Sequence, residues 1–267
     1  MYMDFHTHGK LAKKLPFSTV YTDWLFREAK DAGLDALCLT EHFNTLQFED
    51  LYRYILSAGE RVGDSIVLEN GLRVFPGMET DICEGGHILC VGPAEAILEL
   101  NRCLDPYKEK DKFLPFSKLM DLFEEYPVIV GAGHPFRKGE HMYIPQLPKE
   151  QLGRLHFIDL NGKDVALDKE RTERLTCQMA RNLGIPAVAG SDTHQAVQYG
   201  CIRTRFERDM SRIEEIYDAM KKGQYTIDVL PEAAFHVRTA GLLKRSLKEI
   251  YALGGDYVSV LVAGESI

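Results

Sequence analysis

The residues best suited to chemistry are histidines and carboxylates that follow short apolar segments at five places along the chain. In chain order they are His6, His8, Glu41, His42, Glu79, His87, His134, Asp192 and His194. A single histidine after a strand is more often a hydrogen-bonded surface residue than a metal ligand. Five such positions in succession favour a metal centre. Mixed nitrogen and oxygen ligands suit zinc, manganese or iron better than magnesium, which prefers oxygen alone.

Short apolar segments alternate with longer amphipathic ones. The expected strands are Asp35–Thr40, Leu72–Gly77, His87–Val91, Val128–Gly133, Leu155–Leu160 and Ala187–Gly190, and the expected helices are Thr22–Ala32, Phe48–Val62, Phe116–Glu125 and Lys169–Leu183. This alternation predicts an α/β fold with a mostly parallel sheet, closed as a TIM-like barrel. The carboxyl ends of barrel strands share one face, so the histidines and acids should converge there.

Length and composition suit one barrel domain over residues 1–267, with a helix at about 242–253 packed outside it. The net charge of −8 disfavours nucleic-acid polymers and anionic membranes as partners, but not a small anion. There is no signal-peptide pattern and no apolar run of about 20 residues, so we expect a cytoplasmic protein. The six cysteines are scattered and are expected to be reduced, although disulfides remain an alternative.

Five ordered motifs resemble those of one family. MDFHTH, LTEHFNT, GMETDI with GHILCVG, GAGHP and GSDTH are similar to the pattern of the PHP superfamily, the polymerase and histidinol phosphatase group. The resemblance spans about Met3 to His194. It implies a distorted (β/α)7 barrel, two or three divalent metal ions and, in many members, hydrolysis of phosphate esters.

The resemblance also implies how the ligands are shared. It assigns a first ion to His6, His8, Glu79 and Asp192, a second to Glu79, His87 and His134, and a third to His42 and His194. Members with three ions supply a further histidine or aspartate just after His-x-His. This chain has Gly9-Lys10-Leu11-Ala12-Lys13-Lys14 there, so either a lysine replaces the charge of the third ion or that ion binds more weakly. Glu41 stands where many relatives have aspartate.

Metal chemistry suggests the reaction. Two close ions that share a water lower its pKa and generate a hydroxide that attacks phosphorus. The candidate catalytic residues are Glu79, Asp192 and His194. Asp4 is either a carboxylate that orients a ligand imidazole or a strand-edge residue.

Cations near the predicted catalytic face are candidates to bind an anionic substrate. They are Arg137, which follows GAGHP, Lys13 and Lys14 (with Lys10 beside them), and Lys163, with Asn161 as a hydrogen-bond partner. His141, His156 and His236 are not expected to be ligands. Asn101–Phe116 and His141–Gln151 are expected to be loops that influence substrate choice.

The sequence therefore predicts a metal-dependent phosphoesterase acting on a small phosphorylated metabolite, histidinol phosphate being one candidate. Three alternatives remain open. An amidohydrolase would hydrolyse a C–N bond on the same kind of centre. A nuclease is less favoured, because no basic, aromatic-rich stripe is present. A non-catalytic metal-binding protein is least favoured, because both proposed binuclear sites keep their ligands.

Overall fold

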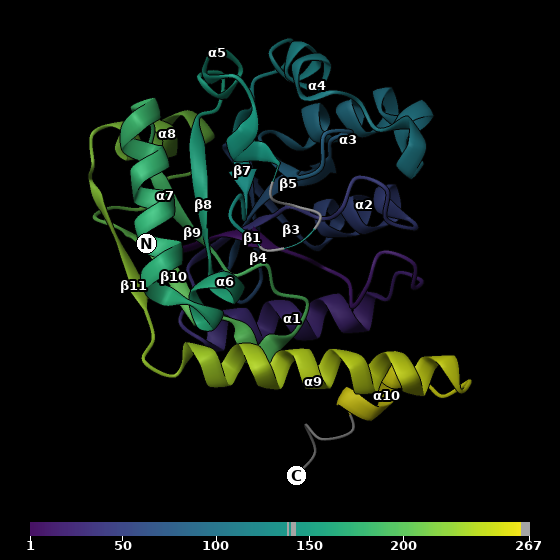
Figure 1. Ribbon diagram of the computed structural model, residues 1–267. Coiled ribbons are helices and arrows are strands. Elements are labelled where there is room, and N and C mark those ends of the chain that lie inside the picture. The colour runs from purple at the N-terminus through teal and green to yellow at the C-terminus, as the bar shows by residue number, and fades with distance from the viewer. Residues whose placement is uncertain (138, 140–142, 263–267) are drawn as a thin grey trace.

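The computed structural model describes residues 1–137, 139 and 143–262. Its central feature is a nearly closed, barrel-shaped sheet whose strand order is β11-β10-β1-β2-β5-β6-β7-β8-β9 (Figure 1). The strands are β1 (Tyr2–Thr7), β2 (Ala36–Leu39), β5 (Arg73–Asp81), β6 (His87–Val91), β7 (Ile129–Gly133), β8 (Phe157–Asn161), β9 (Ala187–Gly190), β10 (Ile202–Phe206) and β11 (Tyr225–Val229). A hairpin of β3 (Gly59–Val62) and β4 (Ser65–Leu68) pairs with β5.

The barrel closes where the chain after β9 meets β1. Thr7 and Thr193 form an isolated parallel bridge. The His8 amide donates to the Thr193 carbonyl at 3.0 Å, and the Asp192 amide donates to the His6 carbonyl at 2.7 Å. The closure therefore brings the first and last of the motifs that carry candidate metal ligands side by side. The distorted barrel predicted from the sequence is confirmed.

The sheet is less parallel than expected: β10 is antiparallel to β1, β4 is antiparallel to β5, and one of the expected strands, β6, is reversed. Strand β6 is antiparallel to both β5 and β7, and its first residue, His87, lies opposite Asp81 and Gly133. The start of β6 therefore lies at the same end of the barrel as the finish of its neighbours. This reversal explains how His87 reaches the end of the barrel where the other candidate ligands lie, although it opens a strand.

Helices cover the outer face of the sheet and both of its ends. Their bounds are α1 (Thr19–Asp31), α2 (Phe48–Ala58), α3 (Ala94–Cys103), α4 (Phe116–Phe123), α5 (Lys149–Leu152), α6 (Gly162–Leu167), α7 (Lys169–Leu183), α8 (Ile213–Lys221), α9 (Ala233–Ala252) and α10 (Tyr257–Val262). Leu25, Leu51 and Met179 of these helices join the main core cluster with strand residues such as Leu37. Figure 1 shows α8 and α9 at opposite ends of the molecule.

Several sequence-based boundaries were wrong. The helix expected at Phe48–Val62 ends at Ala58, and the chain turns into β3. The helix expected at about 242–253 begins at Ala233 and is 20 residues long. Asn101–Phe116 contains the end of α3 and two short 3-10 helices, η1 (Asp105–Tyr107) and η2 (Lys110–Lys112). Searched over its described residues, the chain holds no helix with the length and apolarity that a bilayer crossing needs.

An apolar layer fills the inside of the barrel beneath the polar residues. Phe75, Leu89 and Phe157 are fully buried in one cluster with Phe5. Since side chains alternate along a strand, Phe75 shares a face with Glu79, Leu89 with His87, and Phe157 with Asp159. The register between β1 and β2 shifts between Asp4 and Thr7, so consecutive Phe5 and His6 both reach this inner face. The polar cluster therefore packs on a fully buried apolar layer.

Gly131 leaves space for the Phe157 ring in this apolar layer. A methyl group on Gly131 would lie 2.2 Å from Cε2 of the Phe157 ring. We expect Gly131→Ala to lower the free energy of unfolding by about 1–3 kcal/mol through overpacking, measured by chemical denaturation. Gly153→Ala, where the nearest atom would be 3.4 Å away, is the control and should change it little. Equal stability of the two variants would contradict this account.

Candidate metal centre

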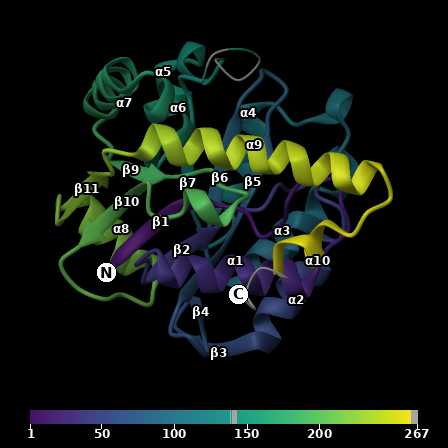
Figure 2. The ribbon, with the colours of Figure 1, turned by 90° about the horizontal axis from the view of Figure 1, so that it is seen from below.

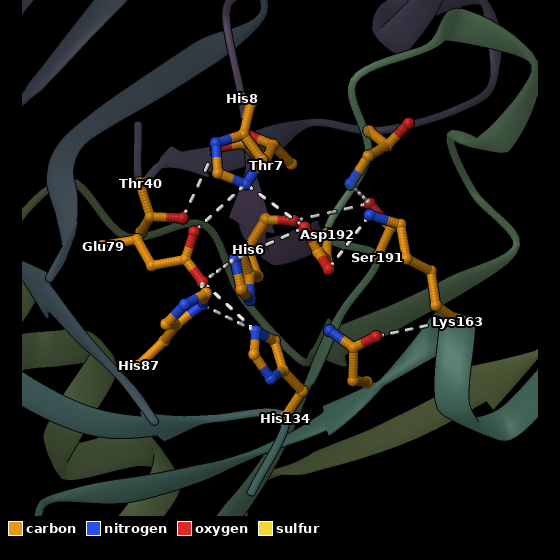
Figure 3. Close-up of polar contacts among 12 residues, drawn as sticks. His6, Thr7, His8, Thr40, Glu79, His87, His134, Lys163, Ser191 and Asp192 are labelled. Carbon is orange, nitrogen blue, oxygen red and sulfur yellow. Dashed lines mark hydrogen bonds and ion pairs between the residues drawn. The ribbon is translucent and has the colours of Figure 1, made fainter. Parts of the chain in front are cut away.

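The eight predicted ligands form one cluster, with the buried carboxylate of Glu79 at its centre. Glu79 is 1% exposed and lies among imidazoles from β1, β6 and the segment after β7, which Figure 3 shows. A further imidazole, that of His42, comes from the segment after β2. Its Oε1 lies 3.4 Å from His6 Nε2 and 3.2 Å from His134 Nε2, and it also contacts His87 Nδ1. Its Oε2 lies 2.9 Å from His42 Nδ1 and 3.5 Å from His8 Nε2. Each oxygen thus faces a different group of histidines, as a bridging carboxylate requires.

Asp192 approaches the same cluster from the opposite side. Its Oδ1 lies 3.2 Å from His8 Nε2 and 3.8 Å from His6 Nε2. The His194 ring stacks on the His8 ring with centroids 4.0 Å apart. Among the described residues, three groups have ligand atoms within 4.8 Å of one another: His6, His8 and Asp192; Glu79, His87 and His134; and His8, His42 and His194. His8 belongs to two of these groups.

The chemistry of these donors fits divalent cations. Within the described part of the chain, His6 Nε2, His8 Nδ1, His42 Nδ1 and Glu79 Oε2 are buried with no hydrogen-bond partner. Buried polar atoms are normally paired, because an unpaired one costs free energy. These atoms approach one another without hydrogen-bond alignment, as donors around a shared cation do. The residues present therefore fit a metal centre with mixed nitrogen and oxygen ligands.

The electrostatics of the cluster keep its carboxylates ionised. Burial acts to raise the pKa of Glu79, but His87, His42 and His6 lower it well below its usual range. Burial likewise acts to raise the pKa of Asp192, but Lys163, Arg137 and His6 lower it well below that range. Ionised carboxylates are the form that binds metal.

Neighbouring groups fix the orientation of individual imidazoles. Asp159 Oδ2 lies 3.0 Å from His6 Nδ1, which leaves His6 Nε2 to face the cluster. Asp81 Oδ1 lies 3.0 Å from His87 Nε2, which leaves His87 Nδ1 to face Glu79. Carboxylates behind ligand histidines set the tautomer and raise ligand basicity. Asp4, which the sequence offered for this role, instead accepts hydrogen bonds from the His6 and Ser191 amides.

Glu41 has a related supporting position. Its Oε1 and Oε2 accept hydrogen bonds from the backbone amides of His42 and Gly9, and Oε1 lies 3.7 Å from His8 Nδ1. It joins the segments that carry His8 and His42. Glu41 therefore stabilises the positions of these two candidate ligands.

The backbone is strained at two of the candidate ligands. His134 has a φ of 31° and Asp192 a φ of 54°, in a region that residues other than glycine rarely adopt. Such strain concentrates at functional sites, where surrounding contacts hold it in place.

Gly190, two residues before Asp192, leaves the space that His6 and Asp159 occupy. A methyl group there would lie 2.5 Å from His6 Cβ and 2.4 Å from Asp159 Oδ1.

The predicted substrate-binding cations fall into two sets. Arg137 donates to Asp192 Oδ2 at 2.7 Å, to Asp164 at 3.1 Å and to Asn161 at 2.7 Å. Lys163 lies 3.0 Å from the same Oδ2 of Asp192. These two cations therefore meet at the edge of the metal centre.

The lysines after His-x-His lie elsewhere. The Lys10 ammonium is buried and donates to Thr45 Oγ1 at 3.1 Å and to the Leu46 carbonyl. Lys14 is exposed. Lys13 lies near enough to Asp81 to lower the pKa of that carboxyl, behind His87. Neither Lys13 nor Lys14 is among the residues that line the adjacent pocket.

The three histidines set aside as non-ligands can be placed in part. His156 Nδ1 accepts a hydrogen bond from the Val130 amide at 3.1 Å, and His236 Nδ1 lies 2.6 Å from the Val197 carbonyl. Both lie outside the groups that could hold an ion. His141 lies outside the described residues.

Sequence reasoning missed several residues around the site. Asp159 and Asp81 behind the ligands, and Lys244 and Arg171 beside the pocket, were not singled out. Strand alternation could have found Asp159 and Asp81, since they share inner faces with predicted barrel positions. No local signal could have placed Lys244, which comes from α9 near the far end of the chain.

Comparisons with known proteins agree with this picture. The PHP_C family model, described as PHP-associated, matches residues 171–225, a range that includes Asp192 and His194. PsfC from Pseudomonas syringae PB-5123 shares 22% identity at a TM-score of 0.72, over 92% of this chain and 98% of that one. The lesion-specific endonuclease PfuEndoQ from Pyrococcus furiosus shares 18% at 0.62, over 85% of this chain and 57% of that one.

A two-domain protein from Bacteroides vulgatus ATCC 8482, containing a predicted PHP-like metal-dependent phosphoesterase, shares 17% identity at a TM-score of 0.56, over 90% of this chain and 69% of that one. None of the curated proteins that were compared with the chain matched it. The chain shares its fold with the three solved structures above, one of which contains a predicted PHP-like metal-dependent phosphoesterase, and residues 171–225 match the PHP-associated family model. The sequence-based argument against nucleic-acid substrates is not supported, because an endonuclease shares the fold.

The support that Asp159 gives to His6 can be tested by Asp159→Asn. An amide cannot supply the same negative charge to the imidazole, so we expect metal affinity to fall about 10- to 100-fold. A metal titration against a competing chelator measures this. Asp218→Asn, at an exposed ion pair on α8, is the control. Unchanged affinity in Asp159→Asn would contradict an orienting role.

Metal binding should also stabilise the fold, because the ion would pair with buried nitrogen and oxygen atoms that otherwise have no hydrogen-bond partner. At a metal concentration 100 times Kd, the expected gain in unfolding free energy is about 2.7 kcal/mol. Thermal melts with and without chelator, repeated with zinc, manganese and iron, would measure it. A melting temperature that no added metal changes would count against the centre.

Proposed function

We propose that the protein is a metal-dependent phosphoesterase that hydrolyses a small phosphorylated metabolite. The observation that carries the proposal is the buried Glu79 among five imidazoles, with ionised Asp192 opposite and two cations at its edge. Histidinol phosphate is one candidate substrate. The proposal assigns metal binding to His6, His8, His42, Glu79, His87, His134, Asp192 and His194.

Divalent ions in such a centre supply a Lewis acid for the phosphoryl oxygens and lower the pKa of bound water. The protein's own contribution begins with the placement of Asp192. Arg137 and Lys163 both hold Oδ2, which leaves Oδ1 directed toward His6 and His8. The two cations also provide positive potential where an anionic substrate would enter.

His194 is suited to bind a metal ion through Nε2. Its Nδ1 lies 2.7 Å from the Lys10 carbonyl, which can only accept, so Nδ1 carries the hydrogen and Nε2 the lone pair. Burial, with His8 and Lys244 nearby, lowers the pKa of His194 well below its usual value. The imidazole is therefore neutral at physiological pH. Glu79, Asp192 and His194 are the proposed catalytic residues.

A second candidate function is cleavage of a phosphodiester in nucleic acid. We retain this candidate because a lesion-specific endonuclease shares the fold over 85% of this chain. The same ligand set would serve either reaction, since both transfer a phosphoryl group to water. The two differ in the size of the group that must lie beside the centre.

The proposal is tested by metal content per chain together with phosphate release. We expect two or three ions per chain, and hydrolysis of p-nitrophenyl phosphate by protein loaded with zinc, manganese or iron. Glu79→Gln and His134→Ala should lower the rate on the order of 100-fold or more, because each removes a ligand from the centre that activates water. His236→Ala, which removes a histidine outside the centre, is the control.

Other outcomes separate the alternatives. Preference for bis(p-nitrophenyl) phosphate or an abasic-site oligonucleotide over the monoester would favour the phosphodiesterase. Bound ions without release of phosphate from any of these would favour C–N hydrolysis. Protein that binds no ion after reconstitution would refute the metal centre itself.

A further inference from the structure

A pocket of about 750 Å³ opens beside the metal centre on the His194 side. Arg137, Lys163, His194 and Gln195 line one side of it, and α9 lines another. Helix α9 packs against α6 and against the 3-10 helix η4 (Ala196–Gln198). In Figure 2 this helix runs across the front of the molecule, over the barrel. The expected outer helix is thus also a wall of the site.

One face of α9 is turned toward this pocket. Val237, Ala240, Gly241 and Lys244 line it. Their spacing of three, four and seven residues places them on one side of a helix. A methyl group on Gly241 would meet no atom within 4 Å. Small residues in the middle of this face therefore leave open space in front of Lys244.

The cations of the pocket differ in how they are neutralised. Arg137 is paired with Asp192 and Asp164, and Lys163 is paired with Asp192. Lys244 forms neither a hydrogen bond nor an ion pair with any residue that the structure describes. Burial, with Lys163 nearby, lowers the pKa of Lys244 to about 7. Asp192 and Glu41 act in the opposite direction, but neither forms an ion pair with Lys244. A half-buried ammonium that no described carboxylate contacts is costly, and an anionic ligand would supply the missing charge.

The rest of the lining limits what that anion can be attached to. Phe136, Leu167 and Val237 provide apolar surface beside the cations. A volume of about 750 Å³ lies within the range of pockets for small molecules. The combination matches a compact organic group joined to a phosphate.

We propose that Lys244 is a substrate-binding residue that, with Lys163, holds the anionic group of a small phosphomonoester in the pocket beneath α9. This inference rests on the proposed phosphoesterase function. It assigns substrate selection to the α9 face at Val237, Ala240, Gly241 and Lys244. The predicted loop at Asn101–Phe116 contributes no residue to this pocket.

The first experiment compares Lys244→Met with Lys248→Met in metal-loaded protein. Lys248 lies one turn further along α9, is exposed and does not line the pocket. Removal of a charge-assisted contact should weaken inorganic phosphate binding in calorimetry about 10- to 100-fold in Lys244→Met. KM for p-nitrophenyl phosphate should rise by a similar factor, with kcat and metal content changed less than about twofold. Lys244→Arg should restore part of the affinity, and Lys248→Met should behave as the unmodified protein.

A steric variant tests the pocket independently of charge. Gly241→Leu projects into the open space, so we expect it to weaken p-nitrophenyl phosphate binding more than inorganic phosphate binding. Thermal melting checks that the variant remains folded. Unchanged KM for the aryl ester in folded Gly241→Leu would overturn the assignment of this pocket.

The remaining outcomes distinguish this inference from the proposed function. Equal phosphate affinity in Lys244→Met and Lys248→Met would overturn the inference while leaving the phosphoesterase intact. A loss of kcat and bound metal without a change in KM would also overturn it, since Lys244 would then be structural. Cleavage of an abasic-site oligonucleotide that neither α9 variant affects would do the same. If the unmodified protein hydrolyses no phosphate ester, the proposed function fails, yet calorimetry with phosphate still decides the role of Lys244.

Discussion

The structure depends on one buried carboxylate, Glu79, surrounded by five histidines. A buried ion is stable only when it is paired or binds metal, so the imidazoles that face Glu79 are a requirement of its burial. They come from strands and turns that lie far apart in the sequence. The barrel must therefore bring these segments together before the charge of Glu79 is compensated. The same carboxylate links the two histidine groups because each of its oxygens faces a different one.

The barrel meets this requirement through local departures from regularity. The register shift in β1 turns both Phe5 and His6 inward. The antiparallel course of β6 brings His87 to the same end of the barrel as the other candidate ligands. The positive φ values at His134 and Asp192 turn the side chains of these two candidate ligands toward the cluster around Glu79. The positive φ values would be unfavourable in isolation, and the close packing of the surrounding structure holds them in place.

Asp192 connects the candidate metal centre with the neighbouring pocket. Its Oδ1 lies near His6 and His8, and its Oδ2 contacts Arg137 and Lys163. A change in charge in the metal centre therefore alters the electrostatic potential in the pocket, and the reverse, because Asp192 contacts both. This arrangement explains why Arg137 and Lys163 can be buried beside a centre suited to metal ions: Asp192 supplies the negative charge that pairs with them. It also means that ligand binding in the pocket and metal binding should be coupled.

The sequence by itself determined the types of residue at the ends of the strands and most of the strands themselves, because these follow from local apolar patterns. Strands His87–Val91 and Ala187–Gly190 and helix Lys169–Leu183 have the predicted bounds. Only the tertiary structure decided the direction of β6, the pairing of Asp159 with His6 and the position of Lys244 beside His194. His6 and Asp159 are 153 residues apart. Local periodicity shows which face a side chain takes, but which distant face it meets depends on how the whole sheet closes.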